Sequence, residues 1–304
     1  MDNALAQGEL VAVRRGVLAA AAELEQRSGR ALHETQLHAA LLAFSGDWHA
    51  ARRSAAVLHG LPLLGAGPRV PLLVREKKQP TERSSSRFRR LAALPPEERT
   101  TARGLPVTSL ARTVFDLARS ESFRSGVVVA DAALRAGLSP ADLEACMERH
   151  RGWPGSRAAR AVAEFADGRA ESPLESLARV AARTTGLPAF EPQVEVWRYG
   201  RFVARVDGLW WDHLLVFEGD GAEKLLSGQD PELVARQEAI RDCGLDVVRA
   251  RWSDVYNQQD AWAARVRARM ATRDGAQLPP GVELVSTAVR LTPASELDTY
   301  RWPS

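Results

Sequence analysis

The sequence predicts an α/β protein with a mostly helical N-terminal region followed by a core of helix, three strands, helix and strand. Apolar residues at helical spacing fill much of the chain up to residue 168. From residue 169 the pattern changes, and three β-like runs follow a single helix. A chain of 304 residues also suits two domains of ordinary size.

The composition is typical of a globular protein. Apolar residues make up 45% of the chain, and no apolar run approaches the roughly 20 residues that a membrane helix needs. The first ten residues have no basic start and no apolar region after them, so we expect no secretory signal and a cytoplasmic location. Cys146 and Cys243 lie far apart, and their spacing predicts neither a zinc site nor a disulfide framework.

The N-terminal stretch "GELVAVRRGVLAA" alternates in the manner of a strand or hairpin arm between glycines. We interpret residues 1–22 as the remnant wing of a winged-helix domain whose groove-entering helices, which would precede the wing, are missing. A misplaced start of the chain is the alternative. Residues 23–168 carry helical patterns, with one buried strand expected at 69–74.

A basic segment interrupts this first region. Residues 75–103 contain nine Lys or Arg against four Glu, a local net charge of +5 in a chain whose total is +3. Such a surface attracts phosphate backbones without reading sequence, although a solvated loop rich in Ser, Thr and Pro explains it equally well. The phosphate-binding candidates here are Arg87, Arg89 and Arg90.

The second region opens on a helix with a full set of start signals. Ser172 is expected as the N-cap, Pro173 as the first helical residue, and Glu175 completes a capping box. The elements expected after it are "EPQVEVW", "FVARVDGLW" and "HLLVFEGD" as strands, "DPELVARQEAIRDCG" as a helix and "LDVVRARW" as a strand. We place this core at 169–271 and a peripheral tail at 272–304.

Acids mark the ends of two of these strands, Asp207 on the second and Glu218 on the third. A carboxylate at the end of a buried strand costs free energy unless something pairs with it. Glu218 is the harder one to explain structurally, because it follows the apolar run "LLVF". Structural alternatives stay open for the other acids, since Glu175 could simply cap its helix and Asp207 could be a turn residue before Gly208.

The order of these elements and acids resembles the PD-(D/E)XK nuclease core. The chain from about residue 10 to residue 255 resembles a bacterial family that joins an AbiEi-type antitoxin region to a domain similar to the very-short-patch-repair endonucleases. The stretches that carry the resemblance are "SAAVLHGLPL", "LPVTSLARTVFDLAR", "ESPLES", "ARVDGLW", "VFEGDG" and "GLDVVRARW". The resemblance implies a DNA-associated protein of phage defence or of a toxin–antitoxin pair.

The resemblance also implies hydrolysis of phosphodiester bonds with Mg²⁺ (or Mn²⁺). Mg²⁺ binds one or two carboxylates, keeps several waters and takes further ligands from phosphate oxygens. It lowers the pKa of the attacking water and neutralises charge on the leaving oxygen. We therefore expect Asp207, Glu218 and Asp220 to hold the metal and Glu175 to hold a metal-bound water.

The motif departs from its pattern at one position. A lysine is expected two residues after the second acid, and Asp220 stands there instead. Lys224 could fold back into the site, or it could be an ordinary surface lysine. On the following helix Arg236, Gln237 and Arg241 are candidates for phosphate contact, unless that face is only solvated.

The sequence therefore favours a metal-dependent endonuclease that binds nucleic acid, DNA above all, and no membrane. The alternative is a catalytically inactive AbiEi-like antitoxin or transcriptional regulator that binds DNA or a cognate toxin. The aspartate in the lysine position and the missing recognition helices favour this alternative. Trp210 and Trp211, beside the acids, either stack on unpaired bases or pack at the strand end.

Overall fold

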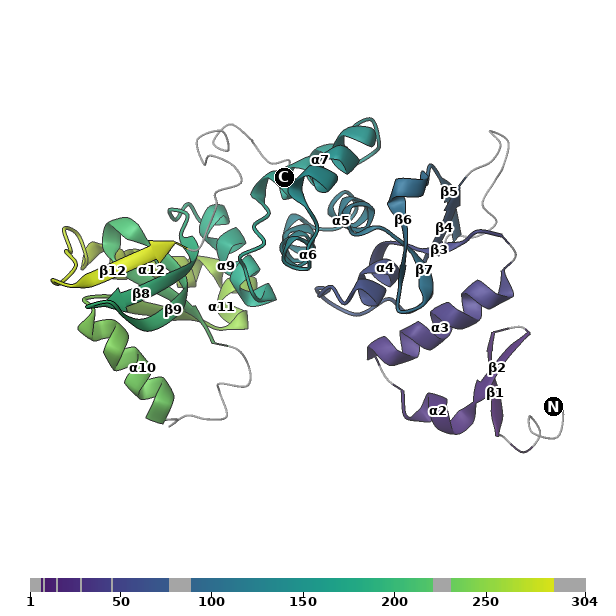
Figure 1. The fold of residues 1–304 in the computed structure, drawn as a ribbon, viewed down its shortest axis with the longest axis horizontal. Helices are drawn as coiled ribbons and strands as arrows, with labels where there is room; N and C mark the ends of the chain where they lie inside the picture. The colour runs from purple at the N-terminus through teal and green to yellow at the C-terminus, as the bar shows by residue number, and fades with distance from the viewer. Residues whose placement is uncertain are drawn as a thin grey trace. The chain divides into compact units, whose positions relative to one another are not determined.

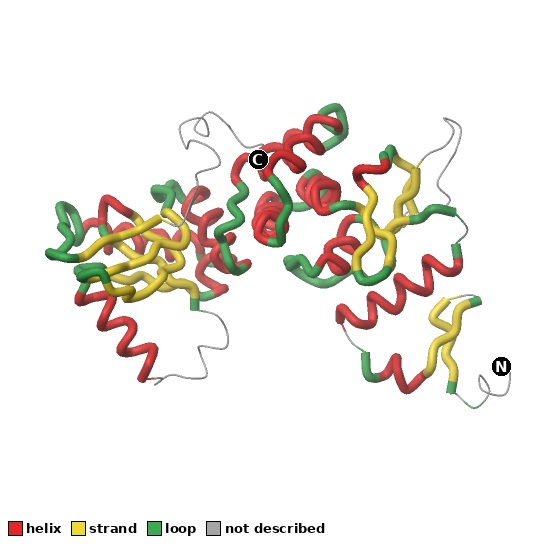
Figure 2. Tube along the Cα trace, viewed as in Figure 1, coloured by secondary structure: helices red, strands yellow, loops and turns green. Residues whose placement is uncertain are grey.

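The computed structural model describes residues 7, 9–14, 16–27, 29–44, 46–76, 89–220 and 231–286. The fold is mixed α/β, and the chain divides into two compact units, Met1–Ala166 and Asp167–Ser304. Each unit has a five-stranded sheet of its own, drawn in yellow in Figure 2. Arg87 and Lys224 lie outside the described residues, as do the side chains of Arg89 and Arg90, so the predictions for them stay predictions.

The first unit starts with an antiparallel hairpin of β1 (Leu10–Arg14) and β2 (Val17–Ala20), where the sequence predicts a strand or hairpin arm. Its larger sheet has the strand order β5-β4-β3-β7-β6. The strands of that sheet are β3 (His49–Ala50), β4 (Leu73–Glu76), β5 (Arg89–Ala92), β6 (Arg99–Ala102) and β7 (Leu105–Thr108). The helices are α2 (Ala21–Glu25), α3 (Gly29–Ala43), α4 (Arg52–His59), the 3-10 helix η1 (Pro96–Glu98), α5 (Leu110–Ala118), α6 (Phe123–Arg135), α7 (Pro140–Arg149) and α8 (Ser156–Phe165).

The sequence predicts a mostly helical first region, and this prediction misses most strands of the five-stranded sheet. Only one of its strands is expected from the sequence, at 69–74, and it lies slightly later at Leu73–Glu76. The five strands have two to four residues each, too few to show a clear two-residue period. Leu37 of α3, Leu58 of α4 and Val107 of β7 share the core that holds the sheet against these helices.

The helices after this sheet form a bundle in which α5 packs against α6, α7 and α8. α7 begins as the sequence predicts: the Ser139 hydroxyl accepts a hydrogen bond from the Asp142 amide at 3.0 Å, and Pro140 follows the cap. Within the described residues, no helix combines the length and the apolar character that a membrane crossing requires.

The second unit shows the predicted order of helix, three strands, helix and strand. These elements are α9 (Pro173–Thr184), β8 (Glu191–Arg198), β9 (Arg201–Trp210), β10 (Leu215–Gly219), α10 (Pro231–Asp242) and β11 (Asp246–Ala250). The remaining elements are the 3-10 helix η2 (Trp211–His213), α11 (Trp252–Tyr256), α12 (Gln259–Ala271) and β12 (Val282–Ser286). The sheet order is β11-β10-β9-β8-β12, with β10 and β11 parallel and the other neighbours antiparallel.

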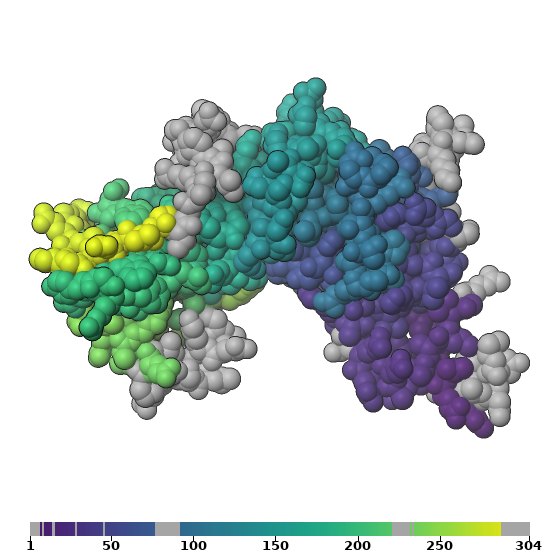
Figure 3. Space-filling view, in the orientation of Figure 1, coloured from purple at the N-terminus to yellow at the C-terminus, as the bar shows by residue number. Residues whose placement is uncertain are grey.

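The prediction of a peripheral tail at 272–304 is wrong for the part that forms β12. This strand pairs with β8 along its whole length, from Val282 opposite Arg198 to Ser286 opposite Val194. Figure 3 shows β12 in yellow on the surface of the second unit, at the edge of its sheet. The strand belongs to the unit because Val282 is buried and Leu284 packs against the core cluster.

The two faces of this sheet are covered differently. Helix α10 covers one face, where its Ile240 joins Val216 in the aliphatic core, while α9, α11 and α12 gather on the other (Figure 1). On that second face Phe190 stacks on Phe217 at 5.0 Å between ring centroids. Gly208, paired with Phe217 across β9 and β10, leaves room for the Phe190 ring. A Cβ atom on this glycine would lie 2.3 Å from Phe190 Cδ2.

We expect Gly208→Ala to lower the free energy of unfolding of the second unit by about 1–3 kcal/mol, because the methyl group would push Phe190 out of the aromatic cluster. Urea unfolding and near-ultraviolet circular dichroism would measure the change. Gly152→Ala is the control, since its Cβ would meet nothing within 4 Å. Equal stability of the two variants would contradict the prediction.

Candidate functional site

Glu218, near the end of the interior strand β10, is buried, with 3% of its surface exposed. Two guanidinium groups compensate its charge. Arg236 of α10 donates to Glu218 Oε1 and also to the carbonyl of Arg205 at 2.9 Å. Arg249 of β11 lies with Nη2 at 3.7 Å from Glu218 Oε2. The buried acid predicted from the sequence therefore exists, and arginines from two elements pair with it.

Asp207 lies on β9 one residue before Gly208, which forms the last β9–β10 pair with Phe217. Its Oδ2 accepts a hydrogen bond from the backbone amide of Gly219 at 2.8 Å. The carboxylate thus links β9 to the end of β10 where the strand pairing stops. The alternative of a turn at Asp207 and Gly208 is wrong, because both residues belong to a continuous strand.

Glu175 caps its own helix, as one of the two interpretations predicts. The Ser172 hydroxyl accepts from the Glu175 amide at 3.2 Å and donates to Glu175 Oε1 at 2.7 Å. The other carboxylate oxygen accepts from the Glu171 amide at 2.8 Å and from Gln193 Nε2 at 3.0 Å. Gln193 is a buried residue of β8 that the sequence reasoning missed, and it connects this cap to the sheet.

Asp220 follows β10 directly and extends its pairing with β11 through a hydrogen bond from its amide to the Ala250 carbonyl at 2.9 Å. Its carboxylate lies 3.7 Å from Arg249 Nη1. Among the described residues, only Glu98, Cys146 and His150 bring three possible metal-ligand atoms within 4.8 Å of one another. The acids predicted to hold Mg²⁺ thus stand at one end of the sheet without forming so tight a group.

The candidates on α10 have different surroundings. Arg236 is held by Glu218 and a backbone carbonyl, so its guanidinium is committed to the fold. The Gln237 amide faces Arg249, and in the orientation that suits these donors its oxygen accepts from both Nη atoms. Arg241 is exposed to solvent.

The two tryptophans also differ. Trp210 is buried, and its Nε1 donates to the Pro188 carbonyl at 2.8 Å, so it packs and cannot stack on a base. Trp211 is exposed.

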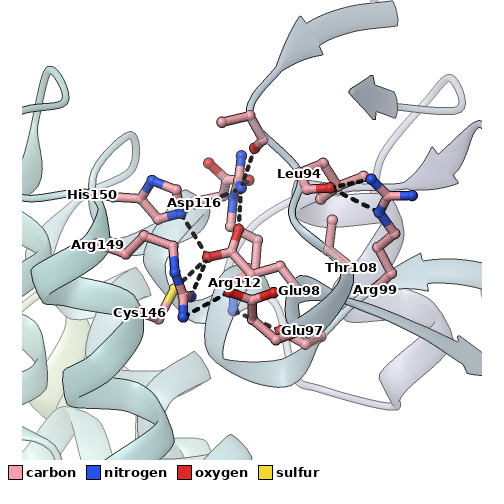
Figure 4. Close-up of polar contacts among 12 residues, drawn as sticks. Leu94, Glu97, Glu98, Arg99, Thr108, Arg112, Asp116, Cys146, Arg149 and His150 are labelled. Atoms are coloured by element: carbon pink, nitrogen blue, oxygen red, sulfur yellow. Dashed lines mark hydrogen bonds and ion pairs between the residues drawn. The ribbon is translucent and has the colours of Figure 1, made fainter. Parts of the chain in front are cut away.

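A second buried cluster of charges lies in the first unit, at residues for which the sequence predicts no functional role (Figure 4). Glu98, at the end of η1, is 1% exposed. Its carboxylate accepts hydrogen bonds from Arg112 of α5, from Arg149 Nη1 at 2.8 Å and from His150 Nε2 at 2.7 Å. Arg112 is equally buried and also donates through Nε to Asp116 Oδ2 at 2.9 Å.

The protonation states in this cluster follow from its contacts. Burial by itself would raise the pKa of Glu98, but hydrogen bonds from His150, Arg149 and Arg112 outweigh it and lower the pKa to about 2. Glu98 is therefore ionised at neutral pH and can only accept hydrogen bonds. It follows that His150 carries a proton on Nε2.

Glu98, Cys146 and His150 have the residue types of a metal site, but their surroundings suit a structural ion network better. The guanidinium groups of Arg112 and Arg149 already donate hydrogen bonds to the Glu98 carboxylate, and their charges would repel a divalent cation. Burial and the nearby charge of Glu98 raise the pKa of the Cys146 thiol to about 12, so the thiolate that a metal needs is disfavoured.

A signal for this network was present in the sequence. Arg112 and Asp116 lie four residues apart in "LPVTSLARTVFDLAR", on a helix whose residues are nearly all buried. A charged pair at that spacing within an apolar helix indicates a buried ion pair. Glu98 and His150 come from distant segments, and no spacing could have added them.

The chain is similar to two curated proteins of Mycobacterium tuberculosis. They are "Uncharacterized protein MT2308" of strain CDC 1551 / Oshkosh and "Uncharacterized protein Rv2248" of strain ATCC 25618 / H37Rv. Each is 33% identical over 177 residues, which cover 55% of this chain and 65% of the relative, so the chain spans less than two thirds of the relatives' length. No family model matches the chain, and no solved structure matches it.

We expect Glu98→Gln to destabilise the first unit by about 3 kcal/mol at pH 7, because it leaves buried Arg112 short of a negative partner. The folded pKa of Glu98 lies below its ordinary value of 4.5, so its stabilising contribution is complete above that pH and is lost as the pH falls towards 2. As the pH falls from 4.5 towards 2, the Glu98→Gln variant should therefore lose less stability than the wild type.

Urea unfolding at several pH values would test this expectation. Glu97→Gln is the matched control, since Glu97 is a half-exposed neighbour whose ion pair with Arg149 should contribute less than about 1 kcal/mol. If Glu98→Gln unfolds like this control at every pH, the network does not stabilise the unit.

Both cysteine thiols should react slowly in the folded protein. Cys146 and Cys243 are buried, and burial raises the pKa of each thiol. We expect 5,5′-dithiobis(2-nitrobenzoate) at pH 8 to modify them at least about 100-fold more slowly in the native protein than in urea. Rapid modification of Cys146 in the native protein would show that this cluster opens or holds a thiolate.

Proposed function

We propose that this chain is a cytoplasmic, DNA-associated protein whose second unit is a Mg²⁺-dependent (or Mn²⁺-dependent) endonuclease-like domain of the PD-(D/E)XK type. The observation that carries the proposal is the buried carboxylate of Glu218 near the end of the interior strand β10, with Asp207 on the adjacent strand. The order α9, β8, β9, β10, α10 and β11 around these acids supports it. Phage defence or a toxin–antitoxin pair would be its setting.

The acids suit the proposed metal chemically. Asp207, Glu218 and Asp220 offer carboxylate oxygens, which Mg²⁺ and Mn²⁺ prefer. When bound, the ion would lower the pKa of a water and neutralise charge on the leaving oxygen. Arginine and backbone donors now engage the acids, so metal binding at Glu218 and Asp220 requires the Arg249 guanidinium to move aside.

Glu175 is better suited to orienting a water than to removing a proton. Its two carboxylate oxygens already accept three hydrogen bonds, from Ser172, Gln193 and the Glu171 amide. These donors occupy the carboxylate oxygens and hold the side chain in place. We therefore assign the second-unit chemistry to Asp207 and Glu218, with Glu175 as a positioning residue.

The second candidate function is a catalytically inactive AbiEi-like antitoxin or transcriptional regulator that binds DNA or a partner toxin. One observation favours it: Arg236 and Arg249 already lie beside Glu218 and Asp220, so these two acids have positive partners without a metal. The aspartate in the lysine position points the same way.

The deciding experiment compares cleavage of supercoiled plasmid and of single-stranded DNA, with Mg²⁺ or Mn²⁺, by the wild type and by Asp207→Asn and Glu218→Gln. These substitutions keep the side-chain shape and remove a metal-binding charge, so we expect each to lower cleavage at least about 100-fold. Asp212→Asn, at an exposed acid of the same unit, should cleave like the wild type.

Calorimetric titration with Mg²⁺ should show weaker binding for the first two variants only. A pure wild-type protein that binds DNA and cleaves neither substrate would reject the nuclease and favour the regulator.

A further inference from the structure

We infer that Arg249 is the residue that binds the phosphodiester of the nucleic acid beside Glu218 and Asp220. The inference rests on the proposed function, because it assigns a substrate contact at the same site. Arg249 would supply the positive charge that is missing two residues after Glu218, where a lysine is expected and Asp220 stands.

The register of the sheet brings Arg249 to the site. Strands β10 and β11 are parallel, and Glu218 is paired directly with Arg249. The guanidinium therefore lies between the two acids, with Nη2 at 3.7 Å from Glu218 Oε2 and Nη1 at 3.7 Å from Asp220 Oδ1. A phosphodiester brought to these carboxylates would therefore meet the Arg249 guanidinium.

The side chains of Arg236 and Arg249 differ in their contacts with the protein and in their exposure to solvent. Arg236 donates to Glu218 and to the Arg205 carbonyl, and its side chain is 31% exposed. Arg249 is 40% exposed, and its contacts with the two carboxylates are longer than a hydrogen bond. A guanidinium with donors still facing solvent can bind two phosphate oxygens at once, so Arg249 is the better suited of the two.

Gln237 of α10 positions this guanidinium. With its amide in the orientation that presents oxygen to Arg249, its side-chain oxygen accepts from Nη1 at 3.2 Å. The contact steadies Arg249 without adding a charge that would compete with phosphate for it. Gln237 thus acts through Arg249, which refines the sequence-based prediction that it contacts the backbone itself.

The charge balance indicates when the phosphate would bind best. Glu218 and Asp220 neutralise Arg236 and Arg249 in the free protein. A divalent cation at the acids would add two positive charges and leave Arg249 without its partners, and an anionic phosphodiester would offset part of that added charge. Oligonucleotide binding and divalent-cation binding should therefore reinforce each other.

The test is fluorescence anisotropy with a labelled 20-nucleotide single-stranded DNA, in EDTA and in Ca²⁺, over a series of salt concentrations. We expect Arg249→Gln to weaken binding in Ca²⁺ about 10-fold and to reduce the slope of log affinity against log salt by about 1. Arg249→Lys should keep the salt slope. The control Arg269→Gln removes an exposed arginine that pairs with Asp246 of the same strand at 2.8 Å, and it should bind like the wild type.

An Arg249→Gln protein that matches Arg269→Gln in affinity and salt slope would overturn the inference, as would a wild type that binds no oligonucleotide in either condition. Plasmid cleavage, measured in parallel, separates the two proposals. Binding that depends on Arg249 without any cleavage rejects the nuclease and leaves the phosphate contact standing. Cleavage that survives Arg249→Gln with unchanged binding leaves the nuclease standing and rejects the contact.

Discussion

A buried carboxylate matched by arginines is the interaction on which each unit depends. An ionised glutamate without partners in a protein interior costs several kcal/mol, so its neighbours must bring positive charge to it. In the first unit the Glu98 carboxylate accepts hydrogen bonds from Arg112 of α5 and Arg149 of α7. In the second unit Glu218 forms ion pairs with Arg236 of α10 and Arg249 of β11. Each acid thereby ties together elements that are distant in sequence.

The two clusters differ in how solvent reaches them, and that difference separates structure from proposed function. Three hydrogen bonds close around Glu98, and its partner Arg112 is as buried as the acid itself. Such a network can rigidify a core, because its polar groups are engaged with one another. Arg249, beside Glu218, is 40% exposed and lies 3.7 Å from the carboxylates of Glu218 and Asp220, so it can exchange a carboxylate for another anion. We therefore propose chemistry only for the second cluster.

The parts of the structure with local signals could be predicted from the sequence. Ser172 and Glu175 specify the start of α9, and the apolar run before Glu218 specifies a central strand with an acid near its end. The sheet of the first unit could not be predicted, because its strands are too short to show a two-residue period. The contacts of Glu98 with Arg112 and His150, 14 and 52 residues away, and the register of Arg249 depend on how distant segments meet, which spacing along a chain does not specify.

The edge strand β12 also has a consequence for how the protein is made. It covers the side of β8 that no other strand occupies, yet it is synthesised roughly ninety residues later. At ribosomal speed that interval is on the order of 10 s. During it the nascent second unit has an uncovered row of backbone donors and acceptors, which invites pairing with other chains. The sheet therefore stays incomplete until β12 has been synthesised, and until then its open edge at β8 can pair with other chains.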